Sequence, residues 1–318
     1  MARIAYLGPE GTFTEAALNQ MTDAGLIPEC GRDALRRLPM ESTPAALDAV
    51  RDGVADYACV PIENSIDGSV MPTLDSLAIG SPVQVFAETT LDVTFSIAVK
   101  PGPGTSPSGA DIRTLAAFPV ARAQVRQWLA ANLPQVEVRP AYSNADAARQ
   151  VADGEVDAAV TSPLAVTHWG LTSLADGVLD EPSARTRFVL TGLPGPAPAR
   201  TGADRTSVVL RIDNTPGALL AALAEFGIRG IDLTRIESRP TRTELGTYLF
   251  FIDCVGHLED GAVAEALKAL HRRCADVRYL GSWPTGQAAG AEPPPVDEAS
   301  IWLARVRAGK PEPGGAGR

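Results

Sequence analysis

Five residues near the end of an apolar segment combine several kinds of polar side chain. Pro61-Ile62-Glu63-Asn64-Ser65 follows Tyr57–Val60, which we expect to be a buried strand, and comes shortly before Gly68. A carboxylate, an amide and a hydroxyl are therefore packed together where the strand should end and a helix should begin. Open α/β sheets bind their ligands at the carboxyl ends of their strands. This segment is therefore a candidate site for binding or chemistry.

A second candidate segment, residues 8–14, joins a predicted strand, Arg3–Leu7, to a predicted helix, Thr14–Met21. The hydroxyl of Thr12 and the free amide groups of the helix start could bind a carboxylate. The segment is not a P-loop, because no Gly-Lys-Thr follows its glycines. Glycine-rich turns of this kind are also common without a ligand, so a structural role stays open.

A third segment, Thr186-Arg187-Phe188, precedes an apolar strand and follows the loop 180–183. A lone arginine at such a place is by default a solvated residue. Its interest therefore depends on the groups that the fold brings beside it.

A weak internal sequence repeat suggests two similar lobes. Val50–Ala58 and Val151–Ala159 both read as the end of a helix closed by Asp-Gly, followed by an aspartate and a buried strand. The similarity could also be chance. If it is structural, Pro61–Ser65 in one lobe corresponds to Thr161-Ser162-Pro163 in the other. The two lobes would then present polar strand ends to a shared cleft, which suits hinge closure over a ligand.

The first two thirds of the chain alternate short apolar runs with helical patterns, which indicates α/β architecture with mostly parallel sheets. Thr43 is predicted to cap a helix that has Pro44 at its first position, and Ser143 with Asp146 forms a predicted capping box. The Pro-rich and Gly-rich residues 101–109 are expected to be a surface connection. The remaining predicted strands cover 83–86, 93–99 and 114–118, and the helices cover 43–51, 120–132 and 143–152.

A Pro-, Gly- and Ala-rich segment, residues 193–204, is predicted to be a domain linker. After it come a strand, a helix, two strands, a helix and a strand, which is the ferredoxin-like βαββαβ order. Leu219, Leu220 and Leu223 have helical spacing and are predicted to be core. Beyond residue 284 we expect a loose tail with one short helix at 296–306. The βαββαβ elements are predicted at 206–212, 216–226, 231–237, 246–254, 262–272 and 277–281.

Length and composition limit the class of protein. A chain of 318 residues predicts two or three compact units. Asp and Glu outnumber Lys and Arg by 38 to 28, which argues against nucleic-acid binding. No apolar segment is long enough for a signal peptide or a membrane span. The four widely spaced cysteines and three histidines form no ligand pattern. We expect a cytoplasmic protein without metal or other cofactor.

Three of these segments, residues 8–14, 61–65 with Gly68, and 186–188, resemble prephenate dehydratase in order and spacing over about residues 3–191. The βαββαβ unit resembles the regulatory ACT domain of that family. Its two phenylalanine-site motifs match Gly217-Ala218-Leu219-Leu220 and Glu237-Ser238-Arg239-Pro240. The chain departs from the family at Phe118–Arg122, where many members carry His-Pro-Gln-Ala-Leu. That imidazole and amide cannot be essential here unless another residue replaces them.

The resemblance implies a fold and an activity. The fold is a two-lobed, periplasmic-binding-protein-like catalytic domain at 1–192, a linker at 193–204, an ACT domain at 205–283 and a tail at 284–318. The activity is the decarboxylative dehydration of prephenate to phenylpyruvate in L-phenylalanine biosynthesis, with allosteric control by L-phenylalanine. The arrangement resembles the actinobacterial form without a fused mutase. Such effector sites lie between subunits, which implies a homodimer or a homotetramer.

The resemblance also implies residue roles. The essential hydroxyl is that of Thr186, which would donate to the leaving oxygen. Arg187 could pair with a substrate carboxylate or fix its own loop, and Glu63 could orient a donor or close a salt bridge. Further residues are expected to bind the substrate: Thr12, Asn64, Ser65, Thr161, Ser162 and Phe188.

Two other functions compete with this one. A two-lobed solute-binding protein or regulator would explain the cleft, but the sequence has no signal peptide and no helix-turn-helix segment. A non-catalytic amino-acid sensor would leave the motifs of the first two lobes unexplained. The sequence leaves open whether arogenate is accepted and which aromatic amino acids activate or inhibit.

Overall fold

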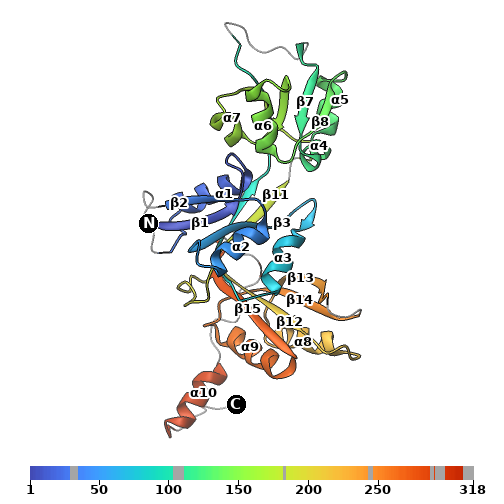
Figure 1. The fold of residues 1–318 in the computed structure, drawn as a ribbon. Helices are drawn as coiled ribbons and strands as arrows, with labels where there is room; N and C mark the ends of the chain where they lie inside the picture. The colour runs from blue at the N-terminus through green and yellow to red at the C-terminus, as the bar shows by residue number, and fades with distance from the viewer. Residues whose placement is uncertain are drawn as a thin grey trace, which may run out of the picture. The chain divides into compact units, whose positions relative to one another are not determined.

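The computed structural model describes residues 1–28, 35–102, 111–181, 184–242, 246–286, 290 and 298–310. The chain divides into two compact units (Figure 1): Met1–Val83 with Ala87–Leu193, and Gln84–Phe86 with Pro194–Arg318. Cys30, most of the predicted 101–109 connection, the end of the 180–183 loop and most of the tail lie outside the described residues.

The first lobe of the first unit is a sheet with strand order β2-β1-β3-β11-β5, and β4 pairs with β3. Its strands are β1 (Ala2–Leu7), β2 (Leu35–Met40), β3 (Tyr57–Asn64), β4 (Gly68–Ser69), β5 (Gln84–Asp92) and β11 (Arg185–Gly192). Its helices are α1 (Phe13–Asp23), α2 (Thr43–Arg51) and α3 (Met71–Ala78). β1 runs parallel to β2 and β3, whereas β11 runs antiparallel to β3.

The second lobe is a sheet with strand order β10-β6-β9-β7-β8. Its strands are β6 (Phe95–Val99), β7 (Thr114–Ala117), β8 (Glu137–Pro140), β9 (Ala158–Thr161) and β10 (Thr172–Val178). Its helices are α4 (Pro119–Gln124), α5 (Arg126–Asn132), α6 (Asn144–Asp153) and α7 (Pro163–His168). β7 runs parallel to β8 and β9, and β6 runs antiparallel to β9 and β10.

The prediction of mostly parallel sheets is therefore wrong, because both sheets are mixed. The chain leaves the first lobe after β5 and returns in β11, and these crossings add antiparallel strands to each sheet. The two crossing segments contact each other, since the backbone N–H of Val93 donates to the carbonyl of Ala184 at 2.8 Å.

The two segments of the internal sequence repeat have the same local structure. In each lobe a helix, α2 or α6, ends just before a glycine with positive φ, Gly53 or Gly154, and leads into a strand that runs parallel to the lobe's earlier strand. The following aspartate binds the start of that earlier strand. Asp56 accepts from the backbone N–H of Arg3 at 2.8 Å, and Asp157 accepts from that of Thr114 at 2.8 Å.

Two predicted helix starts differ in detail. Ser42, not Thr43, caps α2, because its extended backbone lets its hydroxyl accept from the N–H of Ala45 at 3.2 Å. Ser143 caps α6 as predicted, accepting from the N–H of Asp146 at 2.9 Å. The carboxylate of Asp146 accepts from the N–H of Tyr142 instead of completing the box.

The segment 61–65 does not lie between a strand and a helix. β3 continues to Asn64 because the first residues of β11 pair with it, Thr186 with Asn64 and Arg187 with Glu63. Pro61 pairs where the ladder is interrupted, between Arg187 and Phe188, and such irregularities are where a sheet tolerates proline.

The predicted helix 120–132 is two helices, α4 and α5, with Val125 between them in a non-helical conformation. Asp180 occupies this break. Its N–H donates to the carbonyl of Gln124 at 2.8 Å, and its carboxylate accepts from the N–H groups of Gln127 at 2.8 Å and Trp128 at 3.1 Å. A distant carboxylate thus caps α5.

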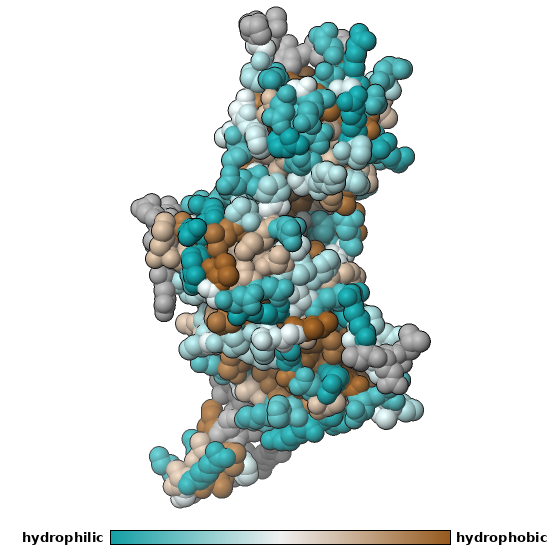
Figure 2. Space-filling view, viewed as in Figure 1, coloured by the Kyte–Doolittle hydropathy of each residue, from teal (hydrophilic) through white to brown (hydrophobic). Residues whose placement is uncertain are grey.

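The second unit has the predicted βαββαβ order, with an antiparallel sheet β13-β14-β12-β15. Figure 2 shows hydrophobic residues on its visible surface. Ile228 and Ile236 are among the exposed residues of this unit. Its elements are β12 (Asp204–Arg211), α8 (Ala218–Gly227), β13 (Leu233–Pro240), β14 (Tyr248–Val255), α9 (Gly261–Arg273) and β15 (Asp276–Pro284). A further helix, α10 (Glu298–Arg307), lies in the tail.

The prediction that Leu220 belongs to the core is wrong, because its side chain is 73% exposed. α8 buries Ala222 and Phe226, and Leu223 packs against that core. These residues share one face of the helix, and Leu220 lies on another.

Each lobe of the first unit has its own apolar core, and Phe13 packs against both. Its ring meets that of Phe95 edge-on, with centroids 5.7 Å apart. Burial raises the pKa of Cys59 to about 12, so this thiol is a packing group. No helix within the described ranges is long and apolar enough to cross a membrane.

Candidate active site

The structure brings Asn64 and Thr186 together. They face each other as partners in the β3–β11 ladder, and the Asn64 Nδ2 donates to the Thr186 Oγ1 at 2.8 Å. Thr186 is only 8% exposed. An amide and a hydroxyl from segments far apart in the sequence therefore form one partly buried pair.

The direction of this hydrogen bond is fixed by the other side of the amide. The Asn64 Oδ1 accepts from the backbone N–H groups of Ile66 at 2.8 Å and Asp67 at 3.0 Å. The amide nitrogen must therefore face Thr186. Thr186 accepts this bond, and no group in the described part of the chain accepts its hydroxyl proton. The hydroxyl can donate to a molecule beside it.

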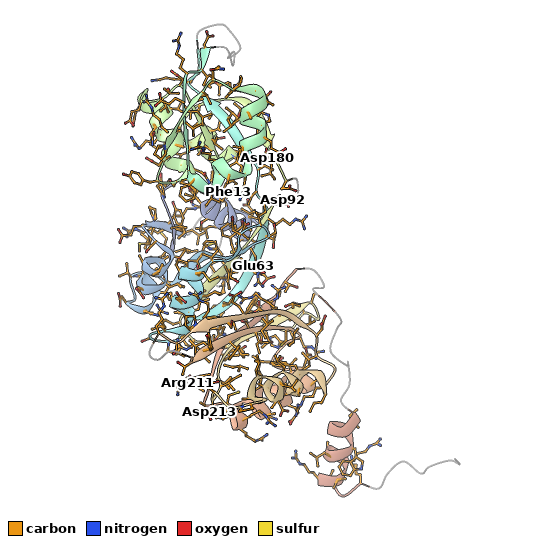
Figure 3. The ribbon with its side chains drawn as sticks, turned by 90° about the vertical axis from the view of Figure 1, so that its right-hand side faces the viewer. Phe13, Glu63, Asp92, Asp180, Arg211 and Asp213 are labelled. Atoms are coloured by element: carbon orange, nitrogen blue, oxygen red, sulfur yellow. The ribbon has the colours of Figure 1, made fainter. Side chains whose placement is uncertain are left out.

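Arg187 points to a different set of partners, as alternation along a strand requires. Its Nη2 lies 3.1 Å from the Glu63 Oε2, and its Nη1 lies 3.4 Å from the Glu88 Oε2. The side chains of Arg187 and Glu88 are 10% and 7% exposed, and that of Glu63 is 41% exposed. Figure 3 labels Glu63 in the first lobe. Two carboxylates hold one guanidinium, so Arg187 fixes its strand more than it offers a free cation.

Ser65 connects the same two segments through the backbone. Its N–H donates to the carbonyl of Arg185 at 2.8 Å, and its Oγ accepts from the N–H of Arg185 at 2.9 Å. Ser65 therefore fastens the end of β3 to the residue before Thr186.

The hydroxyl groups of three other predicted substrate-binding residues donate to backbone carbonyls. Thr12 donates to Leu7 at 3.0 Å, Thr161 donates to Asn144 at 2.6 Å, and Ser162 donates to Gly11 at 2.5 Å. The Ser162 bond joins the two lobes. In this conformation the three hydroxyls can accept a further hydrogen bond but cannot donate one to a carboxylate.

The amides at the start of α1 are also partly used. The N–H of Gly11 donates to the Glu15 carboxylate at 2.6 Å, and the N–H of Glu15 donates to the Thr12 Oγ1 at 3.4 Å. This is a capping arrangement, and it accounts for the polar residues of the turn without a ligand.

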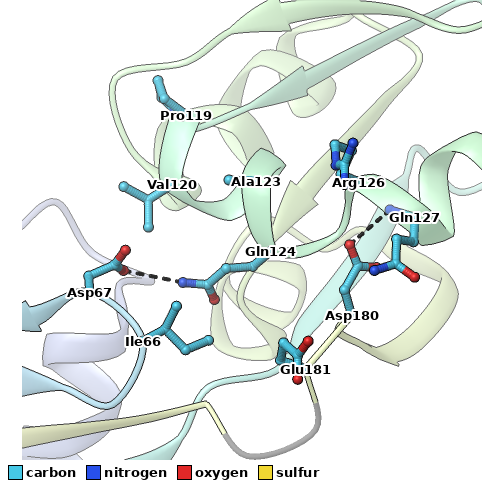
Figure 4. A pocket seen from close by; sticks show the side chains of 10 residues that line it. All are labelled: Ile66, Asp67, Pro119, Val120, Ala123, Gln124, Arg126, Gln127, Asp180 and Glu181. Carbon is cyan, nitrogen blue, oxygen red and sulfur yellow. Dashed lines mark hydrogen bonds between the residues drawn. The ribbon is translucent and has the colours of Figure 1, made fainter.

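A pocket of about 460 Å³ lies between the loop after Asn64 and helix α4 (Figure 4). Ile66 and Asp67, whose N–H groups hold the Asn64 amide, form one wall, and Pro119 and Val120 form part of the other. The segment 118–122, which departs from the family pattern, thus contributes apolar atoms to the pocket.

Gln124 is a residue of this pocket that the sequence prediction missed. Its Nε2 lies 3.4 Å from the Asp67 Oδ2 across the pocket (Figure 4), and its Oε1 is buried without a hydrogen-bond partner in the described part of the structure. The available signal was an amide between the apolar residues Ala121 and Val125. A buried amide oxygen without a partner can accept from a ligand.

Phe188 lies in the core of the first lobe and is 2% exposed, so its side chain packs against protein in this structure. Phe188 is next to Thr186 and Arg187 in the sequence, but its side chain does not lie with theirs in the candidate site.

Of the two motifs predicted to bind the effector, the first contributes to a small hollow in the second unit. Ala218 and Leu219 line it together with Tyr248 and Phe250. These aromatic residues pair with the other motif in the sheet, Phe250 with Ser238 and Tyr248 with Pro240. Gly217 caps α8 with a positive φ of 81° and Leu220 is exposed, whereas Glu237 and Arg239 alternate with Ser238 along β13.

Fold and site together define a two-lobed, periplasmic-binding-protein-like α/β enzyme that carries a ferredoxin-like regulatory unit. A model of the prephenate dehydratase family matches residues 4–194, and a model of the ACT domain matches residues 206–272. The chain belongs to the prephenate dehydratase family and is a hydro-lyase.

Relatives cover nearly the whole chain. The prephenate dehydratase of Mycobacterium tuberculosis strain H37Rv is 81% identical over 312 residues, which are 98% of this chain and 96% of the relative. A crystal structure of prephenate dehydratase from Arthrobacter aurescens, in complex with L-Phe, is 38% identical with a TM-score of 0.83, covering 96% of this chain and 99% of that one.

A second solved structure has a similar fold and is described with a different activity. A protein described as a novel type of quorum quenching acylase is 28% identical with a TM-score of 0.75, covering 89% of this chain and 98% of that one. The family assignment therefore rests on sequence relatives as well as on fold.

Proposed function

We propose that this chain converts prephenate to phenylpyruvate, carbon dioxide and water, with Thr186 as the hydrogen-bond donor to the leaving hydroxyl. The observation that carries the proposal is the Asn64–Thr186 hydrogen bond of 2.8 Å, in which Thr186 is the acceptor and keeps its own proton available.

The chemistry needs few groups from the protein. The bond between the ring and its carboxylate breaks, its electrons complete the aromatic ring, and the ring C–O bond breaks on the opposite side. The hydroxide that leaves needs a proton to become water. A threonine is too weak an acid to give up its proton alone, so Thr186 acts as a positioned donor or relay in a protected site.

The ring carboxylate must not be bound too tightly, because it becomes neutral carbon dioxide in the transition state. A free arginine beside it would stabilise the substrate more than the transition state. Arg187 already shares its guanidinium with Glu63 and Glu88. We assign Arg187 and Glu63 to fixing the strand that carries Thr186.

We assign the remaining predicted substrate residues to the cleft between the lobes. Thr12, Ser65, Thr161 and Ser162 would shape it through their hydrogen bonds to the backbone. Phe188 would support the site from the core.

L-phenylalanine is the proposed effector. The relative from Arthrobacter aurescens is described in complex with L-Phe. The proposal is supported by the hollow that Ala218 and Leu219 of the first motif line, together with Tyr248 and Phe250, which pair with the second motif in the sheet. We propose that the chain works as a homodimer or homotetramer in the cytoplasm. The coupling between effector and substrate is expected to be about 1 to 3 kcal/mol.

One assay tests the activity. The purified chain is incubated with prephenate, and the ultraviolet absorbance of phenylpyruvate is followed with and without L-phenylalanine. We expect turnover, and a change of rate at some substrate concentration when L-phenylalanine is added. Binding of prephenate without formation of phenylpyruvate would support a non-catalytic binding protein instead.

A further inference from the structure

Strand β5 belongs to both compact units. Its first three residues, Gln84–Phe86, group with the βαββαβ unit, and the residues from Ala87 group with the catalytic unit. The strand is continuous over Gln84–Asp92. Since a strand rises about 3.3 Å per residue, a displacement at one end reaches the other within a short stretch of stiff backbone.

At the regulatory end, β5 is held by close backbone contact with β15. A side chain on Gly281 would begin 2.4 Å from the carbonyl oxygen of Val85 and 3.2 Å from its nitrogen. Gly281 also has a φ of +139°, which other residues rarely adopt. The contact therefore depends on glycine, and Val85 is only 1% exposed.

At the catalytic end, β5 places Glu88 beside Arg187. The ion pair of 3.4 Å is buried, with Glu88 7% and Arg187 10% exposed. β5 and β11 are neighbours in the sheet. Losing Glu88 removes one of the two carboxylates that hold the Arg187 guanidinium, and weakening a buried ion pair in this way favours movement of the charged side chain.

Arg187 matters for the position of Thr186 because the strand ladder does not fix it alone. The β3–β11 register shifts between Arg187 and Phe188, and such irregularities bend a strand and re-aim its side chains. Beside the ladder pairs of Thr186 and Arg187, the ion pairs of Arg187 therefore help to hold the backbone just before this irregularity.

We propose that Glu88 is a positioning residue, which holds Arg187 and through it the Thr186 hydroxyl, and that β5 transmits movements of the regulatory sheet to this hydroxyl. The proposal rests on the role given to Thr186 above. It assigns to Glu88 a function that its position in the middle of a strand does not reveal.

The first test compares Glu88→Ala and Glu88→Gln with Asp92→Asn, a control on the same pair of strands. Asp92 pairs with Arg185 at 2.8 Å, but the two side chains are 73% and 65% exposed. We expect kcat to fall about tenfold to a hundredfold in Glu88→Ala and less in Glu88→Gln, with KM changed less than threefold, because misplacing a catalytic group affects turnover. Asp92→Asn should stay within about twofold of the original kcat.

Folding is measured beside turnover by circular dichroism and thermal melting. A merely structural role would lower the melting temperature and leave kcat per folded molecule unchanged, and this result would overturn the proposal. If Glu88→Ala does not fold, Glu88→Gln decides, because it keeps the shape and a hydrogen-bonding group. An unchanged kcat in Glu88→Gln would then count against the positioning role.

The second test examines transmission along β5. Gly281→Ala forces the Val85 carbonyl to move, and we expect it to lower kcat about threefold or more in the original chain but have little further effect in Glu88→Ala. Equal effects in both backgrounds would show that the two sites are independent and would refute the transmission.

Hydrogen exchange of the β11 peptide separates this proposal from the proposed function. We expect faster exchange around Thr186 in Glu88→Ala and Gly281→Ala, but not in Asp92→Asn. If the original chain does not convert prephenate, the proposed function fails and the exchange data still decide the coupling. Unchanged exchange in both variants would overturn it.

Discussion

At the residue scale, the role of Thr186 depends on which way one hydrogen bond runs. The Asn64 oxygen is occupied by two backbone N–H groups, so its nitrogen faces Thr186. The threonine oxygen accepts, and its proton stays available for the leaving group. A hydroxyl that donated to its neighbour could not do this chemistry.

Asn64→Asp is predicted to be the most damaging change of this residue. An aspartate keeps the two backbone N–H bonds but offers Thr186 an acceptor, which captures the hydroxyl proton. We expect kcat at saturating prephenate to fall at least about a hundredfold. Asn64→Ala loses the amide without capturing the proton, so its kcat should be higher than that of Asn64→Asp. The reverse order would mean that Asn64 acts through the shape of the loop.

Sequence reasoning selected Asn64 and Thr186, and the β3–β11 register brings them together. It missed Gln124 and Glu88. A single amide on a helix and a single carboxylate within a strand look like surface residues until the fold buries them, at 9% and 8% exposure. Their partners lie on elements far away in the sequence, so no local pattern marks them.

At the element scale, each lobe has an aspartate, Asp56 or Asp157, that accepts hydrogen bonds from the start of a neighbouring strand. The hydrogen bond from the Arg3 side chain, with that from its backbone, lowers the pKa of Asp56. Burial raises the pKa of Asp157, but hydrogen bonds from Thr114 and Arg113 outweigh it and the pKa is lowered overall. Both carboxylates stabilise the fold when they are ionised.

The stability difference caused by Asp56→Asn or Asp157→Asn should depend on pH. A lowered pKa in the folded state stabilises the protein above the unfolded-state pKa of about 3.9. This stabilisation is lost as the pH falls through the folded-state pKa. Urea unfolding at pH 7 should therefore show a larger loss than unfolding near pH 3. A difference that stays constant with pH would argue against the ionic origin.

The break between α4 and α5 makes a second element-scale prediction. Asp180→Ala removes the carboxylate that accepts from the N–H groups of Gln127 and Trp128, and we expect the free energy of unfolding to fall by about 0.5 to 2 kcal/mol. Glu181→Ala is the control at the next position and should change it by less than about 0.5 kcal/mol. Equal effects in denaturant titrations would show that Asp180 is not a cap.

Sequence patterns predicted most helices and the buried strands, but they missed β2, β4, β8 and β10. β2 and β8 lie at sheet edges and have exposed polar residues, with Arg36 and Arg37 in β2 and Arg139 in β8. They form because a neighbouring strand supplies hydrogen bonds, which an alternating pattern does not reveal. The break at Val125 was missed for a similar reason, since its cause is Asp180 on a distant loop.

At the scale of the whole molecule, the two lobes of the catalytic unit are joined by two crossing segments that touch through Val93 and Ala184. Neighbouring crossings of this kind allow hinge movement. Ser162 also bonds Gly11 from the other lobe at 2.5 Å. The two lobes are therefore joined by the crossing segments and by one direct hydrogen bond, and hinge closure over a ligand stays a prediction.

The exposed apolar residues of the second unit predict self-association. Leu220 is 73% and Ile228 is 74% exposed, and exposed apolar groups on a folded unit often mark an interface. We expect light scattering of the original chain to give at least a dimer, and Leu220→Lys to shift the mass toward the monomer. An unchanged oligomer would place the interface elsewhere.

The change of composition at residues 193–204 is the signal for a linker, and the domain boundaries drawn from it stay a prediction. The sharing of strand β5 between the two units could not be predicted from the sequence. Gln84–Phe86 group with the second unit through contacts such as Val85 with Gly281, and these two residues are separated by most of the chain. Only the folded molecule shows which strand belongs to both units.

The most direct test of the account is the turnover of Thr186→Val compared with Thr186→Ser, on protein shown to be folded. Valine keeps the shape of threonine without its hydroxyl, and serine keeps the hydroxyl. We predict that kcat falls by about a hundredfold or more in Thr186→Val and stays within about tenfold of the original in Thr186→Ser. Near-normal turnover in Thr186→Val would contradict the assignment of Thr186 as the donor to the leaving hydroxyl.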